Sequence, residues 1–220
     1  MKRLRFPARA VLFDWDGTLL NSYAADARAY LAMFSAMGID WNLQDLARHY
    51  SPNWYRVYRA ARLPRARWDE ADRHWTLAYN KEAPGLLPGA RSVLRMLDRN
   101  FLLGIVTSGN RTRVRRQLRH FELADYFAAC VCGEDAPRKK PHPAPLELAL
   151  TRLRADPEEC IYVGDTAEDI EMARRAGVRP IGVLGPFPTA ERVRAAHPDV
   201  LLQTIRDLPQ YLRVSIEPGE

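Results

Sequence analysis

Residues 10 to 22 read Ala-Val-Leu-Phe-Asp-Trp-Asp-Gly-Thr-Leu-Leu-Asn-Ser, and this stretch decides the predicted fold. The apolar run 11–13 predicts a buried strand, and the acids Asp14 and Asp16 follow it directly. Because unpaired carboxylates are costly inside a core, we expect both to emerge at the C-terminal end of the strand, where parallel α/β sheets bind ligands. Gly17 then allows the chain to turn away. Two acids at such an edge can bind a hard cation, with one of them free to attack a substrate, whereas the plain alternative is a solvated acidic turn.

The composition is that of a globular protein large enough for one big domain or for a core with an insert. The chain has 220 residues, of which 47% are hydrophobic and 27% charged. The net charge of +6 is spread along the chain, so attraction of small anionic substrates explains it at least as well as nucleic-acid binding. No helix-turn-helix, zinc-finger or ribonucleoprotein motif is visible, and we expect no nucleic-acid partner.

No apolar run approaches the ~20 residues of a membrane span, so no membrane partner is expected. The basic start at residues 1–5 is followed by a run that Pro7 and Arg9 interrupt, which predicts no export signal. We therefore expect a cytoplasmic protein. Three cysteines read as buried thiols of a reducing compartment: Cys130, Cys132 and Cys160.

Helical patterns fill the region after the first strand. A helix over residues 22–37 can be capped by Ser22, and every plausible segment between residues 43 and 79 is helical. Breaks at Pro84-Gly85 and Pro88-Gly89 follow. The sequence thus predicts an all-helical cap domain over residues 20–86, with residues 1–19 and 87–220 forming an α/β core.

Strands and helices alternate after residue 90. The spacing predicts strands at 102–106, 127–132, 160–163, 180–184 and 200–202, separated by helices near 90–100, 111–119, 145–154 and 166–176, and a closing helix at 205–212. Strands connected by helices of this length form parallel sheets with right-handed crossovers. The predicted fold class is therefore a doubly wound parallel α/β sheet carrying a helical insert.

Polar residues end four of these strands, and in a parallel sheet all four ends meet at one edge. They are Asp14 and Asp16, then Thr107, Ser108 and Gly109, then Lys139 and Lys140 in the next loop, and finally Asp165 and Asp169. Taken singly, each has an ordinary explanation as a turn residue, a helix cap or a solvated side chain. Their occurrence together at one edge favours a cation-dependent site, because several carboxylates there would otherwise repel one another.

These motifs, in this order, resemble the four motifs of the haloacid dehalogenase superfamily of phosphohydrolases. The resemblance covers residues 8 to 185, and the helical insert is similar to that of the phosphoglycolate phosphatase and β-phosphoglucomutase branch. It implies that Asp14 is the nucleophile, that Asp16 is the acid and base, and that Thr107 with the backbone at Ser108 and Gly109 holds the phosphoryl group. Lys140 would neutralise charge, although Lys139 is the alternative if the loop register differs.

The resemblance also implies a Mg²⁺ cofactor. Its ligands would be Asp14, the backbone carbonyl of Asp16 and Asp165, with Asp169 ligating directly or through water. Many relatives have an aspartate where this chain has Asn21, which affects the expected contacts near the hinge. The implied reaction is hydrolysis of a small phosphorylated metabolite, such as phosphoglycolate or a sugar phosphate, through an aspartyl-phosphate.

Substrate choice is expected to lie in the helical insert. Arg56, Arg59, Arg62 and Arg65 recur at helical spacing beside Trp54, Tyr55 and Tyr58. They form either a basic, aromatic surface over an anionic or hydroxylated leaving group, with Arg56 as a substrate-binding candidate, or a solvated helix face above packed aromatic rings.

Other activities remain open from the sequence. Asp16 argues against a dehalogenase, and the position of Lys81, the one lysine of the insert, argues against cleavage of phosphonates. A β-phosphoglucomutase-like mutase would keep all four motifs, and a pyrophosphatase or a nucleotidase stays open as well. A non-catalytic binding or regulatory protein on the same fold is the other alternative, which loss of Asp14 or Asp16 would support, but both are present. The expected assembly is a monomer or a homodimer.

Overall fold

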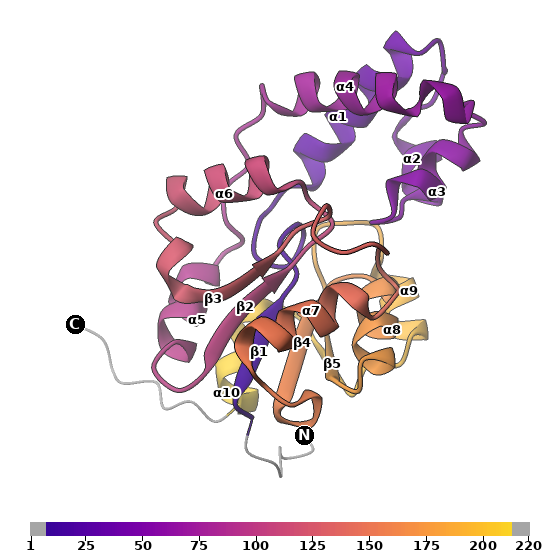
Figure 1. The fold of residues 1–220 in the computed structure, drawn as a ribbon. Helices are drawn as coiled ribbons and strands as arrows, with labels where there is room; N and C mark the ends of the chain where they lie inside the picture. Colours follow the sequence, from indigo (N-terminus) through magenta and orange to yellow (C-terminus); the bar gives the residue numbers. More distant parts are fainter. Residues whose placement is uncertain (1–7, 213–220) are drawn as a thin grey trace.

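The computed structural model describes residues 8–212, so the expectation drawn from the basic start at residues 1–5 lies outside the described residues. Six parallel strands form one sheet in the order β3-β2-β1-β4-β5-β6 (Figure 1). They are β1 (Ala10–Phe13), β2 (Leu102–Val106), β3 (Phe127–Val131), β4 (Cys160–Gly164), β5 (Arg179–Val183) and β6 (Val200–Leu202). The predicted fold class, a doubly wound parallel sheet, is confirmed.

Helices cover both faces of the sheet. They are α5 (Ala90–Leu97), α6 (Arg111–His120), α7 (Ala144–Leu153), α8 (Ala167–Arg175), α9 (Ala190–Ala195) and α10 (Leu208–Leu212). Side chains alternate along β1, so Val11 and Phe13 pack with α5, α6 and α10, whereas Leu12 packs with α7 and α8. Burial on both faces explains why β1 is continuously apolar rather than alternating.

The remaining long helices form a group of their own at the end of the sheet where the strands terminate (Figure 1). This α1–α4 unit consists of α1 (Tyr23–Ala36), α2 (Leu43–His49), α3 (Trp54–Ala60) and α4 (Trp68–Tyr79). It has a separate apolar cluster that includes Phe34, Leu46 and Val57, and Phe187 from the loop after β5 packs into that cluster. The proposal that residues 20–86 form a distinct cap domain is in keeping with this arrangement.

Two chain segments connect the α1–α4 unit to the sheet, and they lie side by side. Leu20 and Leu86 form an antiparallel bridge, and the amide of Asn21 donates to the carbonyl of Gly85 at 2.9 Å. The expected capping by Ser22 is wrong: this residue precedes α1, but its side chain makes no capping hydrogen bond. Its backbone has helical dihedrals, unlike the extended backbone of most N-caps.

Two further expectations concern the cysteines and the membrane. Cys132 and Cys160 are buried and unbridged as predicted, whereas Cys130 is only half-buried because its strand, β3, forms the edge of the sheet. Within residues 8–212, no helix is both long and apolar enough to cross a membrane.

Candidate active site

A buried lysine joins two of the predicted acids at the C-terminal edge of the sheet. The ammonium of Lys140 donates to Asp14 Oδ1 and to Asp169 Oδ1, each at 2.7 Å. Although burial opposes a charged lysine, the charges of Asp14 and Asp169 raise the pKa of Lys140, so it stays protonated. The structure thus brings together residues that lie on three separate segments of the chain, and it places Lys140 rather than Lys139 beside Asp14.

Tyr162 holds Lys140 in place by a hydrogen bond. This tyrosine was not among the site residues predicted from the sequence. Its hydroxyl accepts a hydrogen bond from Lys140 at 2.8 Å and lies 2.8 Å from the backbone carbonyl of Val106 on β2. Tyr162 is completely buried in β4. A tyrosine in a buried strand usually requires a partner for its hydroxyl, and this requirement was the one available signal.

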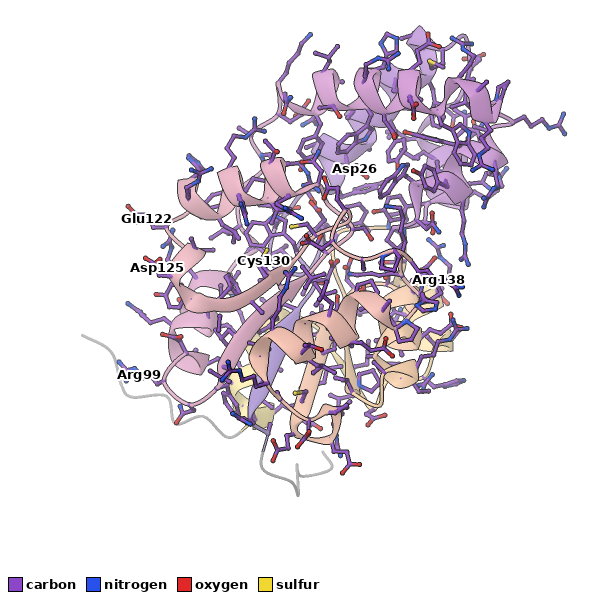
Figure 2. The ribbon with its side chains drawn as sticks, in the orientation of Figure 1. Asp26, Arg99, Glu122, Asp125, Cys130 and Arg138 are labelled. Carbon is purple, nitrogen blue, oxygen red and sulfur yellow. The ribbon has the colours of Figure 1, made fainter. Side chains whose placement is uncertain are left out.

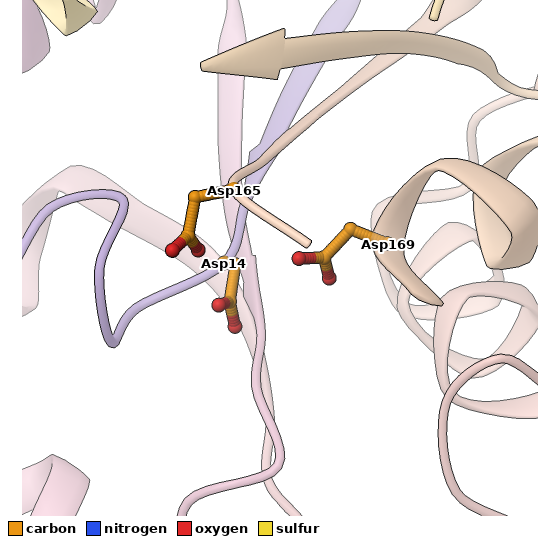
Figure 3. Close-up of side chains that lie close together, drawn as sticks. All are labelled: Asp14, Asp165 and Asp169. Atoms are coloured by element: carbon orange, nitrogen blue, oxygen red, sulfur yellow. The ribbon is translucent and has the colours of Figure 1, made fainter. Parts of the chain in front are cut away.

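Three carboxylates gather around the end of β1: Asp14, Asp165 and Asp169 (Figure 3). One ligand atom from each can be chosen so that all three lie within 4.8 Å of one another, and all three residues are buried. Burial raises the pKa of Asp14 to about 7, and burial together with the charge of Asp14 raises the pKa of Asp165 well above its ordinary value. One lysine does not balance three acids, so the cluster has a deficit of positive charge.

The hydrogen bonds of the cluster show which oxygens remain for a cation. Asp165 Oδ1 accepts from Thr18 at 3.1 Å, whereas Asp165 Oδ2 is buried without a partner among the described residues. Asp169 uses Oδ1 for Lys140 and Oδ2 for the amide and hydroxyl of Thr166, with which it forms a capping box at the start of α8. The set fits a hard divalent cation held mainly by Asp14 and Asp165, with Asp169 in a supporting position.

Gly17 allows the chain to pass close to this cluster. Its φ of +83° is unfavourable for residues with a side chain, and an added Cβ would lie 2.3 Å from Asp165 Oδ2. The glycine that follows the two acids in the sequence is therefore required both by the turn and by the space around the carboxylates.

Asp16 does not belong to the carboxylate cluster, because Arg113 holds it. Arg113 Nη1 donates to Asp16 Oδ1 at 2.9 Å and Nη2 to Oδ2 at 2.7 Å, a bidentate pair. Although burial favours the neutral acid, the charge of Arg113 lowers the pKa of Asp16. The guanidinium also lies 4.9 Å from the ring centroid of Tyr79 on α4. The sequence analysis missed Arg113, because nothing in a basic helix marks which arginine faces inward.

The loop after β2 supplies the predicted hydroxyl and backbone donors. Thr107 is buried, and its Oγ1 accepts from the amide of Gly109 at 3.0 Å. Helix α6 begins immediately afterwards, capped by the side chain of Asn110. The amides of Arg111 and Arg113 are taken by Glu134 and Asn110, so the groups left for phosphate oxygens at this end of the site belong to the loop between β2 and α6, at the positive end of the helix.

A cavity of about 370 Å³ lies between this edge of the sheet and the α1–α4 unit. Of the predicted site residues, the following line it: Asp14, Asp16, Thr107, Ser108, Gly109 and Lys139. Arg56 does not line the cavity: its guanidinium pairs with Glu168 of α8 at 3.4 Å, and its side chain is 54% exposed. Of the two interpretations of this segment, the structure agrees with the solvated helix face above aromatic rings, since its arginines are exposed and its aromatic rings line the cavity. The choice of Arg56 as a substrate-binding residue has no support in this arrangement.

Comparisons with known proteins agree with this geometry. Residues 11–183 match the family model of the haloacid dehalogenase-like hydrolases. The chain belongs to this family. A phosphoglycolate phosphatase from Yersinia pseudotuberculosis is 32% identical over 212 residues, covering 91% of each chain. The pyrophosphatase PpaX from Oceanobacillus iheyensis is 25% identical, covering 91% of this chain and 94% of its own.

A solved structure shares the arrangement as well. The crystal structure of CbbY from Rhodobacter sphaeroides in complex with phosphate superimposes with a TM-score of 0.79 at 25% identity, covering 91% of this chain and 96% of the other. This chain is therefore an enzyme, a hydrolase of the haloacid dehalogenase-like family.

Proposed function

We propose that this hydrolase is a magnesium-dependent phosphatase that cleaves a small phosphate monoester through an aspartyl-phosphate. The observation that carries the proposal is the pairing of Asp14 with Lys140 beside the free oxygen of Asp165, directly below the loop of Thr107. This arrangement places a carboxylate nucleophile and the loop of Thr107 on the wall of one cavity, with Lys140 bonded to the nucleophile from behind that wall. Phosphoryl transfer depends mainly on such positioning and charge neutralisation.

In the first step, a carboxylate oxygen of Asp14 forms a bond to phosphorus while the bond between phosphorus and the ester oxygen breaks. Lys140 neutralises charge on Asp14 and on the phosphoryl group, and it is already held there by two hydrogen bonds. Thr107 and the backbone of the loop between β2 and α6 bind the phosphoryl oxygens. A bound Mg²⁺, held by Asp14, Asp165 and the carbonyl of Asp16 and supported by Asp169, would offset the remaining negative charge.

Asp16 supplies the protons. It gives one to the leaving alkoxide and takes one from the water that then attacks phosphorus and releases phosphate from Asp14. The ion pair with Arg113 keeps Asp16 ionised in the arrangement described here, which is the form needed by the base. To act as the acid, Asp16 has to take up a proton and turn from Arg113 toward the ester oxygen.

The decisive experiment measures phosphate release from p-nitrophenyl phosphate and a panel of phosphorylated metabolites, with Mg²⁺ and with a chelator. Release that depends on Mg²⁺ and leaves a hydroxylamine-labile phosphate on Asp14 in quenched samples supports the proposal. Transfer of phosphate within a sugar phosphate would instead show a mutase, and release from pyrophosphate or nucleotides alone would show those activities. A folded protein that is inactive on the whole panel would contradict the proposal.

A further inference from the structure

The part of the cavity formed by the α1–α4 unit is lined by aromatic rings. They are Tyr30, Tyr50, Trp54, Tyr55, Tyr58 and Trp75. Several of them stack on neighbours, such as Tyr55 on Trp68 at 4.6 Å between ring centroids, and these contacts restrict their orientations. The faces of such rings carry negative electrostatic potential and attract cations.

Two carboxylates stand among these rings, Asp26 on α1 and Asp72 on α4, and both line the cavity. Figure 2 shows Asp26 at the boundary between the α1–α4 unit and the sheet. Within the described part of the chain, neither forms an ion pair; Asp72 accepts a hydrogen bond from Tyr58 at 2.7 Å. Burial raises the pKa of Asp26 to about 8 and that of Asp72 above its ordinary value, and the charges of Arg113 near Asp26 and of Lys139 near Asp72 offset this only in part.

Neither of the cations that line the cavity forms an ion pair with these two acids. Among the lining residues the positive side chains are Arg113, which Asp16 engages on both oxygens, and Lys139. The ammonium of Lys139 lies 3.9 Å from the ring centroid of Trp54 and 5.6 Å from that of Tyr55. Lys139 therefore demonstrates, within this molecule, that the aromatic wall accepts an ammonium group.

The hydroxyl groups of Tyr30 and Tyr50 are a second, independent indication of a ligand. Their side chains are almost fully buried, at 5% and 8% exposed, yet no hydrogen bond of either hydroxyl occurs among residues 8–212. After burial, the charge of Asp26 is the next cause that raises the pKa of both tyrosines, so both hydroxyls lie near that carboxylate. Hydroxyls that lie on a cavity wall without a protein partner are available to a bound molecule.

We propose that this aromatic and acidic wall binds a positively charged leaving group, so that the substrate is a phosphate monoester of an amino alcohol. The inference rests on the proposed phosphatase function and specifies its substrate class. An ammonium group would satisfy Asp26 and Asp72 and lie against the ring faces. An anionic leaving group would meet two acids and no free arginine, and a neutral polyol would leave both carboxylates without a counter-charge.

The test compares each cationic ester with a neutral ester of the same shape. Phosphocholine is matched by 3,3-dimethylbutyl phosphate, and phosphoethanolamine is matched by propyl phosphate. We expect kcat/KM to be roughly 10- to 30-fold higher for at least one cationic ester than for its match, in line with a desolvated cation–π contact. Equal values in both pairs, or a preference for phosphoglycolate over all four esters, would overturn the inference.

Hydrolysis of p-nitrophenyl phosphate separates the two proposals, because it requires the phosphatase chemistry and no cationic group. If that ester is cleaved without any preference for cations, the phosphatase proposal stands and the substrate class is wrong. If no ester is cleaved, tryptophan fluorescence still decides the inference, since choline should quench Trp54 and Trp75 at a lower concentration than 3,3-dimethylbutanol. Equal responses to these two alcohols would overturn it.

Substitutions test whether Asp26 and Asp72 cause the preference for the cationic ester. Asp26→Asn and Asp72→Asn should each reduce the preference for the cationic ester over its neutral match by about tenfold. Asp69→Asn removes an exposed acid of the same helix α4 and should leave the ratio unchanged. The ratio does not depend on the amount of folded enzyme, and circular dichroism checks the fold of each variant. A ratio that is the same in all three variants as in the natural chain would contradict the proposal.

Discussion

The two halves of the cavity differ in how their charges are balanced. On the side of the sheet, Lys140 lies between Asp14 and Asp169, and Arg113 neutralises Asp16. On the side of the α1–α4 unit, Asp26 and Asp72 have no such partners among the described residues, and aromatic rings surround them. The acids on the side of the sheet are paired with cations of the protein itself, whereas those on the side of the α1–α4 unit are suited to pair with a cationic group of a ligand.

Removing the nucleophile should give the largest effect on the sheet side. Asp14→Asn leaves the shape of the site but cannot form the aspartyl-phosphate, so we expect kcat to fall at least about 10⁴-fold. Phosphate release measures the loss, and a thermal melt close to that of the natural chain excludes unfolding. Turnover within tenfold of the natural enzyme would sink the assignment of Asp14 as the nucleophile.

The balance on the sheet side can be broken by removing its cation. Lys140→Met leaves Asp14 and Asp169 buried without their partner, so we expect a loss of about 3–5 kcal/mol in the free energy of unfolding together with loss of activity. Denaturation in urea measures this. Lys139→Met is the matched control, because Lys139 is half-buried against Trp54 and contacts neither acid; its loss should stay below about 1 kcal/mol. Equal effects of the two substitutions would contradict the assigned register.

The deficit of positive charge in the carboxylate cluster predicts stabilisation by Mg²⁺. At 100 times its dissociation constant the ion should add about 2.7 kcal/mol to stability. Asp165→Asn should abolish this gain, whereas Asp156→Asn, an exposed position, should keep it.

The affinity for Mg²⁺ should also depend on pH. The raised pKa of Asp14, about 7, means that the metal-free site holds protons that the ion must displace, so affinity should rise as pH increases through 7. Calorimetry at pH 6 and pH 8 measures the change, and equal affinity at both values would contradict the assigned ligands.

On the side of the α1–α4 unit we expect a smaller effect, and removal of the acid should there stabilise the protein. Because the pKa of Asp26 is raised from 3.8 to about 8 in the folded state, this group lowers stability progressively as pH rises through that interval. Asp26→Asn should therefore gain about 1–3 kcal/mol over the natural chain at pH 9 and much less at pH 5. Urea denaturation at both values, with Asp69→Asn as the control, checks the sign.

The sheet side was accessible from the sequence, because its residues follow strand ends and parallel strands terminate at one edge. The acids of the first motif, the hydroxyl of Thr107 and Asp165 all lie within three residues of a strand, so the backbone determines their position. The parallel pairing of the strands and the helical nature of the insert follow from the same periodic patterns, whereas the order of the strands in the sheet was not predicted. The sequence could not predict which group each carboxylate oxygen would bind, such as the capping box that Asp169 forms with Thr166 at the start of α8.

The other half depends on packing that no local pattern encodes. Arg113 meets Asp16 across 97 residues of sequence, and its neighbours in α6 include arginines that face solvent. The arginines near Trp54 were conspicuous in the sequence, yet the aromatic side chains and two unremarkable aspartates line the cavity. Which face of a short helix turns inward is decided by its contacts with other helices, and periodicity in seven residues is too short to fix it.

The adjacent connections between the α1–α4 unit and the sheet constrain how the two can move. Since Leu20 and Leu86 are bridged and Asn21 bonds to Gly85, the connections form a ribbon that bends far more readily than it shears. Bending about this ribbon would separate the surfaces that meet beyond it, where Ser51 donates to Glu168 at 2.8 Å. The α1–α4 unit would then rotate about one axis through this ribbon, and each opening would break the hydrogen bond between the hydroxyl of Ser51 and the carboxylate of Glu168.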